Sequence, residues 1–522
     1  MALLTETYAD KLALSLEGIV GTLSCFDRVI ITGSLVDIAY PEAMAKTLRI
    51  GGVRLFDYTQ FAEPLRDKVR ANAERLAAEN GLTIEYIQKK NFRKEERVKA
   101  LLKERGNQPG LVHIFSATES CPSFRPWHDK KTGQTFLKRR EAKCLHYYFY
   151  FIDKNLGLCY LRVPTWAPFR LQFYCNGHSW LARQLDRRKI GYTLQDNAFL
   201  GIDDFAKAQA IVDRFDVKKL HHRLDQYARK LCPVVRQFPS GIHWSLMQLE
   251  YATDIVFRTR ENLQLLYEPL VRTTIHAVKA ENVATFLGRK LDPRFAGEAG
   301  NDFHTRIEGT RVRHHFGPAA LKMYDKHGSV LRIETTVNDV TFFKHHRKVE
   351  HRDGTRSMDL APVRKTIHSL GVMAELLRAS NRRYLEFLSA LDLPGVGIRQ
   401  VEKVARPVRK DDHYYPGFNL FHGDDLDLFT ALVRGEFAVS GFRSRHLSRR
   451  AGTRQDRRAG IPSPQTTPPA WNRQKDRSNL QVLPHHARPN RHRLRSATPR
   501  RRRPPGPRWI HSSMTKSLPN RT

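Results

Sequence analysis

The sequence lacks the short motifs that mark several common enzyme classes. It has no phosphate-binding P-loop, no GxGxxG turn after a strand and no HExxH pair. Its six cysteines are scattered without CxxC or CxxH spacing, and no apolar run approaches the roughly 18 residues that a membrane-spanning helix needs. These absences argue against nucleotide hydrolysis, nicotinamide chemistry, zinc proteolysis and a membrane span. They favour a reduced, cytoplasmic protein with no structural zinc.

Acidic residues are scarce relative to basic ones, most of all near the C-terminal end. The 522-residue chain has a net charge of +36. Residues 441–522 hold 21 lysines and arginines against 2 aspartates, whereas the other 440 residues hold 68 basic against 51 acidic residues. A surplus of this size predicts a polyanionic partner, most simply DNA. Nothing in the sequence indicates an oligomeric state.

Helical and strand periodicities alternate along residues 1–240 and predict an N-terminal α/β domain. Aromatic residues occupy both faces of residues 146–151, which favours a strand buried between two layers over a surface that stacks bases. The expected elements are a strand over 26–32, helices over 42–49 and 58–80, a βαβ unit over 83–117, an antiparallel meander over 144–175, and a helix over 217–233.

Three further segments follow, and the overall fold class predicted is α+β. Residues 241–405 indicate a second, mixed α/β domain with an antiparallel sheet: a strand over 244–257, helices over 260–279 and 281–288, hairpins over 309–337 and a long helix over 362–391. Residues 406–447 are typical of a partial winged helix or helix-turn-helix.

Residues 448–522 lose all apolar periodicity and are rich in arginine and proline. Two interpretations stay open for this tail. It is either a disordered basic arm that contacts phosphates, or the product of a frameshift, since codons compatible with residues 463–486 also permit a basic helix and a hairpin when read one base later.

Polar side chains share one face on three strand-like segments between Trp244 and Asp339. Successive side chains of a strand alternate between its faces, so every second residue lies on the same side. The residues that share a face are Gln248, Glu250 and Asp254 in the first segment, Lys322, Tyr324 and Lys326 in the second, and Arg332, Glu334 and Thr336 in the third.

These segments resemble the signature strands of plasmid and filamentous-phage rolling-circle replication initiators. That family runs roughly as Arg-x-Asp-x-Ala-x-Asp, Arg-x-Tyr-Asp-Lys and Arg-x-Glu, and the stretches here read QLEYATD, LKMYDK and LRIETTV in the same order. Gln248 stands where the family usually has arginine, and Glu250 replaces its first aspartate. The whole chain also resembles uncharacterised bacterial proteins that travel with mobile elements and end in a winged helix.

The resemblance implies site-specific DNA nicking and joining, with Tyr324 as the nucleophile that forms a 5′-phosphotyrosine. It implies a divalent Mg²⁺ or Mn²⁺ ion held by carboxylates, the hard oxygen ligands that such ions prefer, and cations that neutralise the phosphoryl oxygens. The implied metal ligands are Glu250, Asp254 and Glu334. The implied cations are Lys322, Lys326 and Arg332. The candidate DNA-binding residues are Arg311, Arg313, Arg443 and Arg445.

Several alternatives remain open at this point. The arginine, lysine and glutamate side chains of the three strands could form ordinary cross-strand ion pairs on a solvated face. Asp27 could belong to a carboxylate triad that binds two Mg²⁺ ions, completed by Asp196, Asp203 or Glu334. No His-hydrophobic-His triplet exists, so a histidine-built metal site is not expected. The basic segments 89–97 and 130–143 offer phosphate contacts or form a solvated face. The second class of function is a non-catalytic DNA-binding transcriptional regulator.

Overall fold

The computed structural model describes residues 18–89, 91–291, 299–306 and 309–390, with short pieces between 405 and 482. The chain divides into two compact units, residues 1–398 and 399–522. The described part of the second unit includes two short hairpins: β16 (Val408–Lys410) with β17 (His413–Tyr415), and β18 (Arg473–Asp476) with β19 (Asn479–Val482). The predicted winged helix (406–447) and tail (448–522) fall largely outside the described residues.

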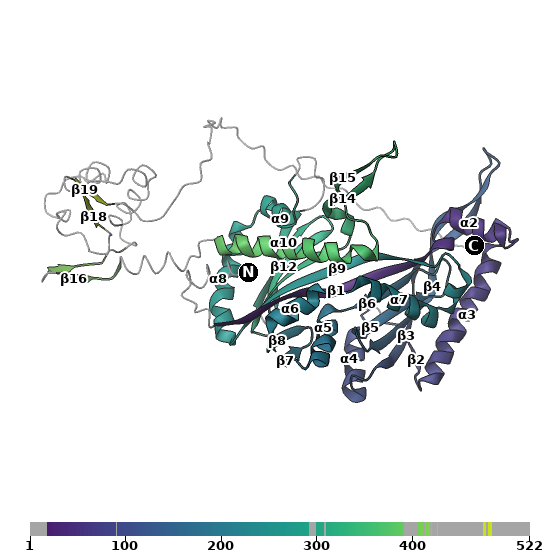
Figure 1. Ribbon diagram of the computed structural model, residues 1–522, viewed down its shortest axis with the longest axis horizontal. Coiled ribbons are helices and arrows are strands. Elements are labelled where there is room, and N and C mark those ends of the chain that lie inside the picture. The colour runs from purple at the N-terminus through teal and green to yellow at the C-terminus, as the bar shows by residue number, and fades with distance from the viewer. Residues whose placement is uncertain are drawn as a thin grey trace, which may run out of the picture. The chain divides into compact units, whose positions relative to one another are not determined.

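One sheet of eleven strands organises the first unit, in the order β10-β11-β12-β13-β9-β1-β6-β5-β4-β3-β2 (Figure 1). Only the β2–β3 pair is parallel within this described sheet. Its strands are β1 (Ile19–Leu35), β2 (Ile84–Tyr86), β3 (Gly110–His128), β4 (Thr135–Asp153), β5 (Gly157–Pro164), β6 (Leu171–Cys175), β9 (Ile242–Phe257), β10 (Ala299–Arg306), β11 (Gly309–Phe316), β12 (Ala319–Lys326) and β13 (Val330–Val337).

The central pairing of the sheet joins the two halves of the sequence. Strand β1 pairs with β9 along nearly its whole length, from Ile19 opposite Phe257 to Leu35 opposite Ile242. Strands from before and after residue 240, where the sequence predicted a domain boundary, therefore belong to one continuous sheet. The described residues on both sides of position 240, from Val29 to Leu388, contribute to one core.

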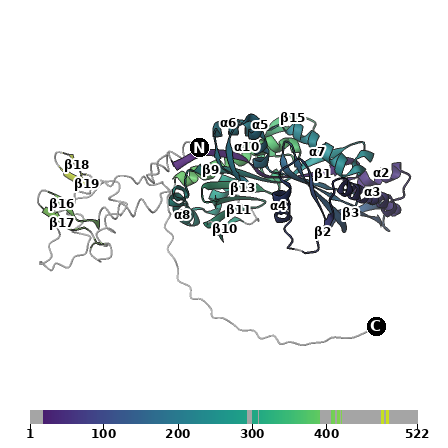
Figure 2. The same ribbon diagram turned by 90° about the horizontal axis from the view of Figure 1, so that it is seen from below.

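Helices cover both sides of this sheet. In Figure 2, α7 (Val217–Leu231) and α10 (Leu370–Ala390) lie on one side and α4 (Lys94–Arg105) on the other. The remaining helices are α2 (Pro41–Ile50), α3 (Tyr58–Glu79), α5 (Gly177–Arg188), α6 (Phe205–Asp213), α8 (Arg260–Ala277) and α9 (Ala280–Phe286). Helices α5, α6 and α8 begin at capping side chains: Asn176 accepts a hydrogen bond from the amide of Ser179, Asp204 from that of Lys207, and Thr259 from that of Asn262.

Most predicted elements are confirmed to within a few residues. The predicted βαβ unit is β2–α4–β3, and the predicted meander is β4–β5–β6. The aromatic strand is buried as expected, since Tyr147 and Tyr148, which point to opposite faces, are 4% and 6% exposed. Helix α10 begins at Leu370 rather than near residue 362. The hairpin of β14 (Lys344–Glu350) and β15 (Arg356–Pro362) ends at Pro362, and a 3-10 turn over Ile367–Ser369 directly precedes the helix.

Other features were not predicted. Strand β10 and the hairpin of β7 (Tyr192–Gln195) and β8 (Ala198–Ile202) were missed, and β3 and β4 extend well beyond their predicted ends. All six cysteines are free thiols. No helix among the described residues is long and apolar enough to cross a membrane.

Candidate functional site

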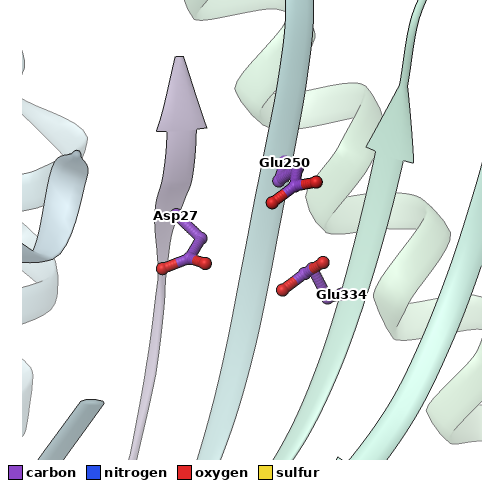
Figure 3. A group of neighbouring side chains, drawn as sticks. All are labelled: Asp27, Glu250 and Glu334. Atoms are coloured by element: carbon purple, nitrogen blue, oxygen red, sulfur yellow. The ribbon is translucent and has the colours of Figure 1, made fainter. Parts of the chain in front are cut away.

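Three carboxylates from neighbouring strands converge on one side of the sheet. Asp27 comes from β1, Glu250 from β9 and Glu334 from β13, and one oxygen of each lies within 4.8 Å of the others (Figure 3). Asp27 is 7% exposed and Glu334 is 2% exposed, whereas Glu250 is partly open to solvent. The cluster is therefore shielded from most of the water that would screen its charge.

Strand register explains two members of this cluster and a bulge explains the third. Glu334 lies opposite Ala252 and therefore on the same face as Glu250. The β1–β9 register shifts between Phe26 and Arg28, which leaves Asp27 as an extra residue on β1. Such a bulge bends the strand and redirects a side chain. It accounts for the inclusion of Asp27 beside the two glutamates.

Tyr324 and Lys322 on β12 complete the site. The hydroxyl of Tyr324 donates to Oε2 of Glu334 at 2.8 Å. The ammonium of Lys322 lies 2.6 Å from Oε1 of Glu334 and 3.6 Å from Oε1 of Glu250. Tyr324 is half-buried. The structure thus brings the predicted tyrosine, one predicted lysine and two predicted glutamates together, and the lysine–glutamate pair is not on a solvated face.

The electrostatics of the cluster favour a bound cation. Burial and then the charge of Glu334 raise the pKa of Glu250 above its usual 4.5. Burial and Glu334 likewise raise the pKa of Tyr324 well above 10. Both shifts have the same two causes, burial first and then the negative charge of Glu334, and a positive ion would oppose the second of them.

Arg332 and Asp254 do not face this cluster as free side chains. Arg332 is fully buried, and its Nε and Nη2 donate to the two oxygens of Asp254 at 2.6 and 2.7 Å. Its Nη1 lies 3.4 Å from Oδ1 of Asp27. Burial alone would lower the pKa of Arg332, but the charges of Asp254 and Asp27 raise it well above its usual range. Asp254 was predicted as a metal ligand, yet both of its oxygens bind Arg332, and Asp27 joins the glutamates instead.

His178 and Asn197 are functional candidates that the sequence did not single out. His178, at the start of α5, has Nδ1 3.1 Å from Oδ1 of Asp27 and Nε2 3.5 Å from Oδ2 of Asp254. Asn197, in the β7–β8 turn, donates from Nδ2 to Oδ1 of Asp27 at 2.5 Å and accepts at its side-chain oxygen from Lys326. No local motif could reveal them, since both reach the site through tertiary packing.

The predicted cations fall into different environments. Burial and Arg332 lower the pKa of Lys326, which shares the Tyr324 face of β12. Arg313 lies opposite Lys322 in the β11–β12 register, and its guanidinium is 3.8 Å from Asp302. Arg311 lies two residues away on the same face of β11. Arg443 and Arg445 lie outside the described residues.

The other carboxylates considered for a triad with Asp27 lie elsewhere. Asp196 contacts the ammonium of Lys99 at 2.7 Å, and Asp203 accepts a hydrogen bond from the amide of Gly191 at 2.9 Å. Of the partners weighed for Asp27, the structure therefore brings only Glu334 to it among the described residues.

The residues present fit a divalent metal ion. Three carboxylates are hard oxygen donors of the kind that Mg²⁺ and Mn²⁺ prefer. The hydroxyl of Thr336, opposite Glu250 in register, is buried without a hydrogen-bond partner and offers one more oxygen donor. Lys322 already places a positive charge between the two glutamates. The donor set suits such an ion, and the mutual repulsion of Glu250 and Glu334 would be relieved by it.

Comparisons with known proteins add a weak likeness. No protein-family model matches the chain, and no curated protein matches it either. Among solved structures, the chain is similar to a rolling-circle replication initiator protein from Geobacillus stearothermophilus, with 10% sequence identity and a TM-score of 0.19, over 61% of this chain and 75% of that one. A likeness this slight carries no argument, so the chemistry must come from the residues of the site.

Proposed function

We propose that the protein is a metal-dependent DNA nicking-joining enzyme, of the kind that starts replication or transposition of a mobile element. The observation that carries the proposal is the hydrogen bond from Tyr324 to Glu334, made inside a group of three carboxylates whose oxygens lie within 4.8 Å of one another. A nucleophile, a base for its proton and a set of metal ligands are thereby adjacent.

In the proposed reaction the phenol oxygen of Tyr324 attacks a DNA phosphorus atom. The new bond joins that oxygen to phosphorus, and the bond from phosphorus to the 3′ oxygen breaks, which leaves a 5′-phosphotyrosine and a 3′ hydroxyl. Glu334 takes the phenol proton across their 2.8 Å hydrogen bond. Lys326, whose pKa is lowered by burial and by Arg332, supplies a proton to the departing 3′ oxygen. Attack by the 3′ hydroxyl reverses these steps and rejoins the strand.

A cation at the carboxylates would serve this chemistry in two ways. A Mg²⁺ or Mn²⁺ ion held by Asp27, Glu250 and Glu334 would polarise the phosphate and offset the negative charge that raises the pKa of Tyr324. Lys322 neutralises charge on the same phosphate from the strand beside Glu334. Arg332 and Asp254 would not touch the substrate. They hold the side chain of Asp27 in position through the contact between Arg332 and Asp27.

DNA is the proposed substrate because the chain has a basic surplus and because basic residues lie beside the site. The body of the chain carries a surplus of basic residues, and Arg311 and Arg313 continue the face of the site onto the next strand outward from Tyr324. Arg443 and Arg445, in the predicted helix-turn-helix, would add a second set of phosphate contacts.

The test is incubation of the full-length protein with supercoiled plasmid in Mn²⁺ or Mg²⁺, followed by denaturing electrophoresis. The expected products are nicked circles and a covalent protein–DNA adduct, both lost in Tyr324→Phe. The control is Tyr86→Phe, an exposed tyrosine that contacts Thr118 and lies outside the site. An adduct that persists in Tyr324→Phe overturns the proposal. Salt-sensitive binding with no cleavage by the unaltered protein would instead support a DNA-binding regulator.

A further inference from the structure

Strands β3 and β4 continue past the sheet as a two-stranded ribbon. Pairing between them runs without interruption from His113 opposite Tyr150 to His128 opposite Thr135. On the outer sides, β2 reaches only Ser116 of β3, and β5 reaches only His146 of β4. Residues 118–128 and 135–145 therefore pair only with each other among the described strands. At about 3.4 Å per residue these eleven pairs span roughly 35 Å.

One face of the ribbon packs against the core as far as its outer half, and the tip is ordered by hydrogen bonds. Phe124 and Leu137 are buried in the main core, where Phe124 packs edge-on against Tyr58. At the tip the amide of Asp129 donates to the carbonyl of Gln134, and the side chain of Asp129 accepts from the amide of Lys131. The hairpin extends past α2 at the upper right of Figure 1. The ribbon therefore has a fixed register, a packed face and a tip that projects past α2.

The face of the ribbon that lies opposite to Phe124 and Leu137 carries cations and aromatic rings. Its members alternate along the two strands and are cross-strand neighbours: Arg125, Trp127, Phe136, Lys138 and Arg140. We call these five residues the ribbon face. Trp127 is 40% exposed and Phe136 is 38% exposed, which is unusual for large apolar side chains unless they meet a partner.

Contacts within the ribbon face hold its cations in place. The ammonium of Lys138 lies 3.8 Å from the centre of the Trp127 ring and 5.5 Å from that of Phe136, and the guanidinium of Arg125 lies 5.3 Å from Trp127. These cation–π contacts reduce the entropy that the long side chains would lose on binding. Because Lys138 covers the indole, the ring orients a cation and is less suited to stack on a base.

The charge of the ribbon selects a polyanion. Residues 125–143 hold seven lysines and arginines against two acidic residues. Beside the middle of the ribbon, a hollow of about 410 Å³ is lined by Arg139, Arg140 and Arg170, with Glu141 as its acidic member. A row of cations leading to an arginine-lined hollow suits a chain of regularly spaced phosphates.

The ribbon face lies on the same side of the sheet as the candidate site. On β4 the side chains of Lys138 and Tyr148 share a face, since the register between them is unbroken. Tyr148 and Tyr160 are in ring contact at 6.0 Å, Tyr160 stacks on Tyr174, and Arg28 covers Tyr174 next to Glu250. Four strand spacings, about 19 Å, separate β4 from β9 across this face.

We propose that the β3–β4 ribbon binds duplex DNA, with the ribbon face in the major groove, beside the strand that the site would cleave. A two-stranded ribbon has the width that the major groove admits, and exposed cations along it meet the flanking phosphates. This rests on the proposed function for the choice of DNA as the polyanion. It adds a partner surface and assigns it to duplex rather than single-stranded DNA.

The test measures binding without cleavage, in EDTA, by fluorescence anisotropy of a labelled duplex and of a single strand of equal length. The variant is full-length Arg125→Gln/Lys138→Gln/Arg140→Gln. Its control is Lys46→Gln/Lys68→Gln/Lys103→Gln, which removes the same charge from exposed positions on α2, α3 and α4. Circular dichroism establishes that both variants are folded.

The expected result is duplex affinity at least about tenfold weaker in the ribbon variant, with the slope of log K against log salt reduced by about 3, one for each phosphate contact removed. Bound duplex should also shield Trp127 from iodide quenching, a signal absent in Trp127→Phe. Equal duplex affinity and equal salt slope in the two triple variants overturns the inference, as does a loss confined to the single strand. Neither result bears on nicking, and Tyr324→Phe should bind the duplex normally.

Discussion

Arg332 and Asp254 form a buried two-point ion pair at the centre of the sheet. Their side chains are 0% and 1% exposed, and the two N–O distances are 2.6 and 2.7 Å. Asp27 and His178 contact the same pair, so the bulged strand β1 and helix α5 are fixed to β9 and β13 through it. The pair sets the position of a carboxylate of the site without belonging to the carboxylate cluster itself.

Breaking this pair should be costly. Arg332→Met leaves Asp254 buried without its partner, and we expect the free energy of unfolding to fall by about 3–5 kcal/mol in urea denaturation. Arg332→Met/Asp254→Leu should lose less than the single variant. For comparison, Arg356→Gln, which removes an exposed pair with Glu350 at 3.2 Å, should cost less than about 1 kcal/mol. A cost of that small size for Arg332→Met would contradict the buried role.

Metal affinity should distinguish Asp27 from Asp254. Asp27→Asn removes one of three converging ligands, so Mn²⁺ binding, followed by electron paramagnetic resonance, should weaken at least about tenfold. Asp254→Asn should destabilise the fold while leaving Mn²⁺ affinity within a few-fold in the folded protein. The opposite pattern would return Asp254 to the ligand set that the sequence predicted.

The raised pKa of Glu250 predicts that metal ions stabilise the protein more at neutral than at acidic pH. The folded state binds the Glu250 proton more tightly than the unfolded state, so this group's contribution to stability is present below its usual pKa of 4.5 and lost as pH rises through the folded value. Mn²⁺ should restore it. We expect the rise in Tm on adding Mn²⁺ to be large near neutral pH and small below 4.5.

Glu250→Gln provides the control for this prediction. Without metal it should raise Tm near neutral pH, because it removes a charge that burial and Glu334 disfavour. Adding Mn²⁺ should raise the Tm of Glu250→Gln only slightly. A Tm response to Mn²⁺ that matches the unaltered protein at every pH would show that the ion binds elsewhere.

His314 predicts a loss of stability in mild acid. It is buried on β11 between Asn301 at 2.6 Å and the hydroxyl of Tyr384 at 3.0 Å, and burial followed by His315 lowers its pKa from 6.5 to about 4. The unfolded chain binds this proton first, so the contribution is present above 6.5 and lost as pH falls toward 4. The loss should approach about 3 kcal/mol.

His314→Gln tests that account by removing the titration. It should lower the free energy of unfolding near neutral pH and flatten its dependence on pH between 6.5 and 4, both measured by urea denaturation at several pH values. A pH dependence as steep as in the unaltered protein would assign the proton uptake to another group.

The sequence alone determined the local elements and the contents of three strands. Alternation on β9, β12 and β13 placed Glu250, Tyr324 and Glu334 on one face, because period-2 patterning is a property of each strand by itself. Helices such as α3 and α4 follow from their own apolar spacing. The β14–β15 hairpin could not be predicted from the sequence, because both strands are largely exposed and lack an apolar face.

Only the tertiary structure decided which strands became neighbours. Pairing of β1 with β9 joins segments more than 200 residues apart, and no local pattern encodes that choice or the bulge that brings in Asp27. The tertiary structure also decided that Asp254 neutralises Arg332 while Asp27 faces the glutamates. A buried guanidinium pairs most strongly with a carboxylate that can accept hydrogen bonds on both of its oxygens, and Asp254 is placed to do so. The sequence specifies the chemistry of each side chain, but long-range strand pairing determines which side chains are neighbours.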